Sequence, residues 1–183
     1  NPQRVTIQGY RGDAMEPFIG RDGKYLFFNN SNDPAVDTNL YWAERIDDLT
    51  FRYRGEIGGV NSTKLDGVAS MDRNGVFYFV STRSYDQTAS TIYRGSFDNG
   101  TVTGVELAPG VSIATPLIVN FDAEISPDGK TLYFVESRFS ASGQPQTADI
   151  LIANWNGSAF VGDSNSATIM KQVNTSKSLE YAP

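Results

Sequence analysis

The hydrophobic positions of this chain form short runs separated by polar turns. Three runs are apolar at nearly every position and rich in aromatic residues: Tyr25–Phe28, Val76–Val80 and Leu132–Val135. A run that is apolar on both faces of a strand is expected to be buried on both faces. Each run follows a turn whose residue types tolerate the positive φ of a tight hairpin: Asp22-Gly23, Asn74-Gly75 and Asp128-Gly129. No segment has sustained helical periodicity, so the pattern predicts an all-β fold.

The same pattern predicts a unit of four antiparallel strands around each turn. The strand before the turn is expected at Pro17–Ile19, Gly67–Ser70 and Ala123–Ile125. The strand that follows the apolar run is expected around Leu40, Ile92 and Ile150. The outermost and more polar strand is expected at Phe51–Arg54, Thr101–Leu107 and Phe160–Gly162. Two further segments, Arg4–Gln8 and Ile169–Val173, are candidate strands that would complete or cap a unit.

The unit recurs at a nearly constant spacing. The turn glycines Gly23, Gly75 and Gly129 lie 52 and 54 residues apart. A four-stranded antiparallel unit of this length, with buried strands on its inner side, predicts a β-propeller blade. We therefore predict one propeller-type domain over residues 1–183. Its blades are expected near residues 13–60, 61–115 and 116–175, and residues 176–183 would open a further blade.

The third unit carries the clearest family signature. Ser126-Pro127-Asp128-Gly129-Lys130 precedes an aromatic strand, and Asp149-Ile150-Leu151 opens the next strand. This arrangement resembles the WD40-like (PD40-type) repeat of TolB-like proteins. The first unit has Gly20-Arg21-Asp22-Gly23-Lys24 at the same turn, and the second has the looser Met71-Asp72-Arg73-Asn74-Gly75. The resemblance implies a β-propeller fold and a periplasmic or secreted location in a bacterium.

Three blades do not close a ring, because propellers typically have about four to eight. Three arrangements would satisfy the exposed faces of an open arc. The chain could be part of a longer propeller, two copies could associate as a homodimer in a six-bladed ring, or the terminal segments could cap the arc.

Composition excludes several classes of function. The net charge is −6 and the sequence pI is about 4.6, so the chain lacks the basic surface that nucleic-acid binding needs. No apolar run approaches the roughly 18 residues of a membrane span, so no membrane insertion is expected. The chain has no Cys and no His, which excludes Cys/His zinc sites and His-dependent catalytic triads. It contains no signal-peptide pattern and begins at Asn1 without Met, so any leader is expected to precede Asn1.

Acidic residues recur where each innermost strand begins, at Glu16, Asp66, Asp122 and, in the incipient fourth unit, Glu180. In a propeller these positions lie near one mouth of the central channel. A ring of carboxylates could bind Ca²⁺ or the hydroxyl groups of a polar ligand. Alternatively, each acid accepts backbone N–H bonds at the corner between loop and strand, which is a structural role.

The loops after the apolar runs, at Asn29–Asp37, Ser81–Thr88 and Glu136–Thr147, are expected on the same face. Their amide, aromatic and guanidinium groups could contact a saccharide or peptide, and the candidates are Asn30, Arg83, Tyr85, Arg138 and Phe139. The alternatives are an ordinary solvated loop and, for the two arginines, a recurring Arg–acid bridge between blades.

Asp33 and Asp37 are weak candidates for a Ca²⁺ site, in a segment that includes Asn32 and Pro34. Their spacing matches no EF-hand loop, and a turn rich in Asn and Asp explains the same residues. No other cofactor is expected.

The sequence favours a non-catalytic binding scaffold that presents a loop-lined face to a protein, peptide or carbohydrate. One alternative is a carboxylate-dependent glycoside hydrolase, for which Asp13 with Glu16, or Asp122 with Glu124, could supply the two acids. The other alternative is a purely structural assembly unit.

Overall fold

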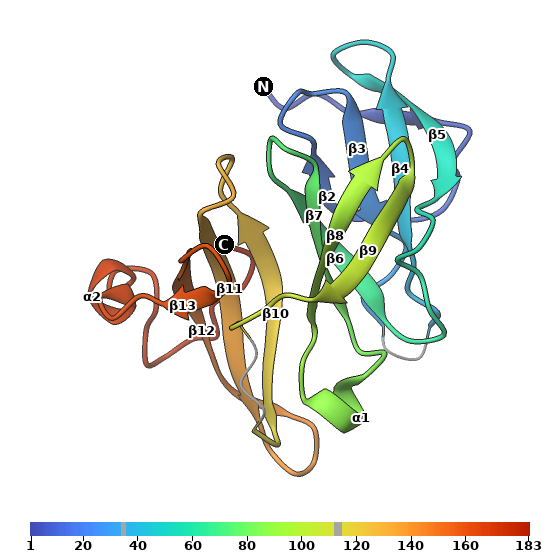
Figure 1. The fold of residues 1–183 in the computed structure, drawn as a ribbon. Coiled ribbons are helices and arrows are strands. Elements are labelled where there is room, and N and C mark those ends of the chain that lie inside the picture. Colours follow the sequence, from blue (N-terminus) through green and yellow to red (C-terminus); the bar gives the residue numbers. More distant parts are fainter. Residues whose placement is uncertain (34–35, 112–114) are drawn as a thin grey trace.

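The computed structural model describes residues 1–33, 36–111 and 115–183. Three sheets follow one another along the chain and account for most of the regular structure in these residues (Figure 1). The two helices of the described chain, α1 (Tyr85–Thr88) and α2 (Ser166–Ile169), are single turns. None of the described helices is long and apolar enough to cross a membrane. The prediction of an all-β fold is confirmed.

The first sheet contains four antiparallel strands that are neighbours in chain order. They are β2 (Met15–Ile19), β3 (Tyr25–Asn29), β4 (Leu40–Arg45) and β5 (Thr50–Glu56). A fifth strand, β1 (Thr6–Gln8), pairs in parallel with the outer strand β5.

The second and third sheets have the same order of four antiparallel strands. The second contains β6 (Asp66–Met71), β7 (Val76–Ser81), β8 (Ile92–Asp98) and β9 (Thr101–Leu107). The third contains β10 (Ile118–Ile125), β11 (Thr131–Phe139), β12 (Pro145–Trp155) and β13 (Phe160–Gly162). In each sheet, the strand before the glycine turn is an edge strand. These three edge strands, β2, β6 and β10, lie next to one another and are called the inner strands below.

The turns form where the sequence predicts them. Gly23, Gly75 and Gly129 have φ values of 74°, 80° and 72°, which only glycine adopts without strain. The candidate strand at Arg4–Gln8 is confirmed as β1. The candidate at Ile169–Val173 is wrong. Ile169 is the last residue of α2, and the residues after it form a turn closed by a hydrogen bond from the Val173 amide to the Met170 carbonyl (2.8 Å).

The loop predicted at Glu136–Thr147 is also mostly strand. The ladder between β11 and β12 continues outward through polar residues, where Glu136 pairs with Asp149 and Arg138 pairs with Thr147. Backbone hydrogen bonds extend this hairpin although its side chains no longer carry a hydrophobic signal.

The hydrophobic core lies between consecutive sheets. Phe27 of β3 packs edge-on against Phe77 of β7 and Phe97 of β8, with ring centroids 5.1 and 4.9 Å away. A second cluster joins the other face of the second sheet, including Tyr78, to Leu132 and neighbouring residues of the third sheet. The central strands β3, β7 and β11 are therefore buried on both faces, as their continuous apolar runs predict.

The two outer faces of the series are covered by segments of the same chain. Tyr10 lies edge-on against Phe28 on the outer face of the first sheet, with ring centroids 4.9 Å apart. Met170, after α2, packs on the outer face of the third sheet beside Val135 and Ile150. The structure gives no support to a ring shared between two chains.

A polar network joins the inner edges of all three sheets. Glu124 of β10 forms an ion pair with Arg21, which follows β2, and accepts a hydrogen bond from the Ser70 hydroxyl of β6 (2.8 Å). The same hydroxyl accepts the Ile125 amide (3.0 Å). These contacts hold β2, β6 and β10 side by side.

Candidate functional site

Each innermost strand contains a bulge at the same place in its ladder. The register shifts between Met15 and Phe18 in β2, between Gly67 and Ser70 in β6, and between Phe121 and Glu124 in β10. Within these bulges Glu16, Val68 and Asp122 have positive φ values of 48°, 53° and 49°. A bulge redirects the side chain that it carries. By this register, Glu16 and Asp122 are equivalent, and Val68 stands at the corresponding position of the second sheet.

The three bulges surround a cavity of about 620 Å³ at the end of the sheets where β2 and β6 begin. It is lined by Glu16, Asn29, Asn32, Thr38, Leu65, Gly67, Val68, Val80, Thr82, Thr91, Val119, Phe121, Asp122, Phe139, Tyr181 and Ala182. Aliphatic and aromatic side chains make most of its wall. The charged groups among these lining residues are the carboxylates of Glu16 and Asp122.

Glu16 is half-buried and oriented by two amides. Its Oε1 accepts a hydrogen bond from Asn32 Nδ2 (2.8 Å), and Asn32 Oδ1 in turn accepts one from the fully buried Asn29 (2.8 Å). Burial raises the pKa of Glu16, and the nearby Asp122 carboxylate raises it further, while hydrogen bonds from the two asparagines act in the opposite direction. The side chain therefore gains a proton more readily than an exposed glutamate.

The carboxylate of Asp122, like that of Glu16, is partly buried without a positively charged partner among the described residues. Its Oδ2 accepts a hydrogen bond from the Ala182 amide (3.2 Å), and burial raises the pKa of the carboxyl group. Neither Asp122 nor Glu16 takes part in a salt bridge among the described residues. Two acceptors facing a largely apolar cavity can hold hydrogen-bond donors of a bound molecule.

Asp66 does not belong to this cavity, which corrects the expectation of a single ring of acids. Its side chain is fully buried and forms an ion pair with Arg83 (2.7 Å). The Ser62 amide and hydroxyl also donate to it (2.5 and 2.7 Å). A fully buried carboxylate that accepts three hydrogen bonds stabilises the fold. Asp66 therefore has the structural role, at the corner between loop and strand, that the sequence analysis gave as the alternative to ligand binding.

The sequence contains a signal that separates these acids. Glu16 lies seven residues before the turn glycine Gly23, and Asp122 lies seven before Gly129, but Asp66 lies nine before Gly75. Because side chains alternate along a strand and the bulge adds a residue, this difference of two places Asp66 outside the bulge. Val68 holds the matching position.

The five loop residues predicted to contact a ligand do not lie together in the structure. Arg83 donates to Asp66, Ser81 and the Val60 carbonyl, and its guanidinium lies over the Phe79 ring (5.3 Å to the centroid). This Arg–acid bridge is within the second sheet and not between sheets. Arg138 is exposed and forms no ion pair with the described residues, so the bridge does not recur.

Two other loop candidates contact backbone rather than the cavity. The Tyr85 hydroxyl donates to the Ile118 carbonyl (3.2 Å). Asn30 donates to the Asp37 carbonyl and accepts the Asn39 amide (3.0 and 2.8 Å), which fixes the loop after β3. Phe139, by contrast, does line the cavity.

The candidate Ca²⁺ segment shows turn geometry where it is described. The Asp33 amide donates to the Ser31 hydroxyl (3.0 Å), and Pro34 lies outside the described residues. Within residues 1–33, 36–111 and 115–183, no three Asp, Glu, His or Cys side chains gather as a metal site would require.

Neither acid pair proposed from sequence for hydrolysis is brought together in the cavity. Asp13 is exposed and does not line it, and Glu124 is occupied by Arg21 and Ser70. The cavity instead joins Glu16 of the first sheet to Asp122 of the third. Sequence analysis placed both acids in one ring of carboxylates but paired only acids of the same unit for hydrolysis, so it did not propose this pair.

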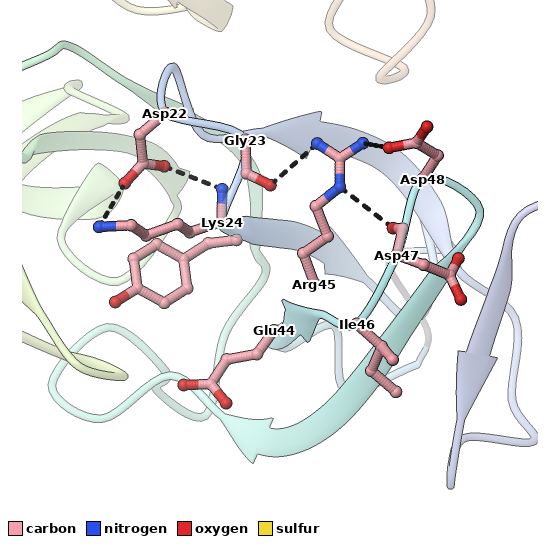
Figure 2. A pocket seen from close by; sticks show the side chains of 9 residues that line it. Asp22, Gly23, Lys24, Glu44, Arg45, Ile46, Asp47 and Asp48 are labelled. Atoms are coloured by element: carbon pink, nitrogen blue, oxygen red, sulfur yellow. Dashed lines mark hydrogen bonds and ion pairs between the residues drawn. The ribbon is translucent and has the colours of Figure 1, made fainter.

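A second hollow, of about 550 Å³, lies at the opposite end of β3 (Figure 2). Its charged side chains already have partners. Arg45 pairs with Asp48 (2.8 Å) and donates to the Asp47 carbonyl (3.1 Å), and Lys24 pairs with Asp22 (3.5 Å). These exposed pairs leave little unmet charge for a ligand, so the cavity around Glu16 and Asp122 is the stronger candidate.

No protein-family model matches the chain, and a search of curated proteins returned no relative.

Proposed function

We propose that this chain is a TolB-like β-propeller-type repeat protein, in which the three sheets are successive blades. The shared strand order, the corresponding turns and the side-by-side inner strands β2, β6 and β10 support this arrangement. The proposal includes the periplasmic or secreted bacterial location that the resemblance implies.

Its function, we propose, is to bind a protein, peptide or carbohydrate without catalysis. The observation that carries this proposal is the cavity in which Glu16 and Asp122 meet. Two carboxylates that form no salt bridge with any described residue offer acceptors for amide or hydroxyl donors, and the wall formed by Val119, Phe121 and Phe139 offers apolar contact. A concave, mostly apolar site with a few convergent polar groups is typical of ligand recognition.

Arrays of defined peptides and defined glycans test this function. Val119→Trp would fill the cavity, and Val161→Trp, at an exposed position of β13, is the matched control. We expect the wild-type chain and Val161→Trp to bind the same array members, and Val119→Trp to lose them. Binding that survives in Val119→Trp would move the site elsewhere, and no binding by the wild type would favour a purely structural unit.

A hydrolase remains the second candidate, because the two cavity carboxyls both have raised pKa values. Glycoside hydrolysis needs one carboxyl that can donate a proton and a second that acts as base or nucleophile. Turnover of chromogenic glycosides, abolished by Glu16→Gln and by Asp122→Asn without loss of folding, would establish catalysis. A chain that binds glycans but leaves every glycoside intact would exclude it.

A further inference from the structure

The three equivalent bulge positions carry two acids and one aliphatic residue. Glu16 of β2 and Asp122 of β10 line the cavity, and Val68 of β6 lines it at the matching position. Because β6 contacts both β2 and β10, the wall at these bulges runs from one carboxylate past an apolar side chain to a second carboxylate. A repeated structural device would place an acid in all three bulges, so the bulge itself does not require the two acids.

The cavity contains negative charge without a positive partner. The described residues that line it include no lysine or arginine, and neither carboxylate belongs to a salt bridge with a described residue. Burial, and then the nearby Asp122 carboxylate, raise the pKa of Glu16, because like charges at a partly buried site repel one another. A cation bound beside both acids would compensate this repulsion.

The polar side chains of the wall leave mainly acceptors for a ligand. The hydroxyls of Thr38 and Thr91 donate to backbone carbonyls. The side-chain amide of Asn29 donates within its own loop, and that of Asn32 donates to Glu16. An ionised carboxylate only accepts hydrogen bonds. The ligand that fits must therefore supply donors, and one that presents carboxylate or phosphate oxygens would be repelled.

The rest of the wall favours an organic cation over a metal ion. Aliphatic side chains line the cavity together with the aromatic residues Phe121 and Phe139. An ammonium group is attracted to an aromatic ring within about 6 Å of its centroid, and an alkyl stem gains free energy when aliphatic side chains bury it. Ca²⁺ takes about six to eight oxygen ligands, whereas no three acidic side chains gather among the described residues.

We propose that the cavity binds a protonated primary amine on an apolar stem, with the ammonium group held by Glu16 and Asp122. The inference rests on the binding function proposed above and names the ligand chemistry of the same site. An ammonium group has three donors, so one group can serve both carboxylates. Val68 and Phe121 offer apolar contact to the stem. A free amine and the lysine side chain of a peptide present this same chemistry.

Isothermal titration calorimetry of the chain at neutral pH compares hexylamine with hexanol, which has the same stem without the charge. We expect hexylamine to bind at least about tenfold more tightly, because charge-assisted hydrogen bonds are stronger than neutral ones. The double variant Glu16→Gln/Asp122→Asn should lose this preference. Asp48→Asn/Asp98→Asn is the matched control, since it changes the net charge equally at exposed positions outside the cavity, and it should keep the preference.

A peptide arm identifies the source of the amine. The probe is acetyl-Gly-Leu-Lys-Leu-Gly-amide, and its control is the same peptide with Nε-acetyl-lysine, which keeps the stem and removes the charge. If the lysine peptide binds at least about tenfold more tightly than hexylamine, and acetylation removes that gain, the source is a lysine side chain. Tighter binding of hexylamine than of the peptide assigns the site to a free amine.

Three results of these titrations would overturn the inference: equal affinity for hexylamine and hexanol, no binding of either amine at roughly ten millimolar, or an unchanged preference in Glu16→Gln/Asp122→Asn. Displacement of hexylamine by calcium chloride, but not by sodium chloride of equal ionic strength, would also overturn it by identifying a metal site. If array ligands are lost in Val119→Trp although neither amine binds, only the amine inference fails, and the proposed binding function stands.

Discussion

Asp66 and Asp122 are aspartates of two neighbouring inner strands, β6 and β10, yet their surroundings are opposite. Asp66 is fully buried and neutralised by Arg83, with two further donors from Ser62. Asp122 is half-buried, faces a cavity with Glu16 and has no cationic partner among the described residues. Position relative to a bulge, and not residue type, therefore separates the structural acid Asp66 from the candidate binding acid Asp122.

The largest expected effect follows from removing the cation that neutralises Asp66. Arg83→Met keeps an apolar stem over Phe79 but leaves a fully buried carboxylate without its counter-charge. Breaking a buried ion pair on one side typically costs about 3–5 kcal/mol, so we expect a loss of about 3 kcal/mol in the free energy of unfolding, measured by urea denaturation. Arg83→Lys, which retains the charge, should recover part of this loss. A change below about 1 kcal/mol would show that Asp66 does not depend on Arg83.

A smaller loss is expected when Asp66 keeps its cation but loses one donor. Ser62→Ala deletes the hydroxyl that lies 2.7 Å from Asp66 Oδ2, while the Ser62 amide continues to donate. Hydrogen bonds to charged groups contribute about 1.5–3 kcal/mol, and the remaining donors compensate in part, so we expect a loss of about 1.5 kcal/mol. Ser158→Ala, in an exposed turn, serves as the control in the same denaturation series.

For Glu16 and Asp122, in contrast to Asp66, removing the negative charge should not lower the free energy of unfolding, because burial disfavours their charged forms in the folded protein. Raised pKa values mean that the folded protein binds protons more tightly than the unfolded chain at Glu16 and Asp122. This contribution to stability is fully present below the reference values of 4.5 and 3.8, and it is lost as pH rises through the raised folded values.

The double variant Glu16→Gln/Asp122→Asn removes that dependence on pH. The stability of the wild type relative to the variant should therefore fall as the pH is raised from about 4 to about 7. At neutral pH the variant should be at least as stable as the wild type, with a difference below about 1 kcal/mol, since both carboxyls retain contact with water. Denaturation curves across this range provide the measurement, and a relative stability that rises with pH would contradict the assigned surroundings.

The smallest effect is expected at Arg138, the counterpart of Arg83 in the third sheet. Arg138 is exposed and has no ion pair with the described residues. Arg138→Met should change the free energy of unfolding by no more than about 0.5 kcal/mol, as exposed substitutions usually do. A loss comparable to that of Arg83→Met would mean that the two sheets hold their arginines alike.

Local features of the fold were predictable because they depend on neighbouring residues. The glycines at 23, 75 and 129 need positive φ, and the apolar runs at β3, β7 and β11 need burial on both faces, so turns and central strands could be placed from the sequence. The outer parts of β11 and β12 could not, because polar residues continue that hairpin through backbone pairing alone. The prediction of a strand at Ile169–Val173 was wrong for a different reason: Met170 packs on the third sheet from a bend after α2, and Ile169 and Val173 are exposed.

The alternation of short buried strands with glycine turns could be predicted from the residues alone, because these patterns are set by the chemistry of adjacent residues. The tertiary structure was needed to show that Glu16 and Asp122 line the cavity without Asp66, that Arg83 neutralises Asp66, and that Tyr181 stacks on Phe121. These contacts join residues that are not neighbours along the chain: Glu16 and Asp122 belong to different sheets, and Tyr181 lies outside the strands of the third sheet. Their geometry depends on how whole sheets pack, which no local pattern specifies.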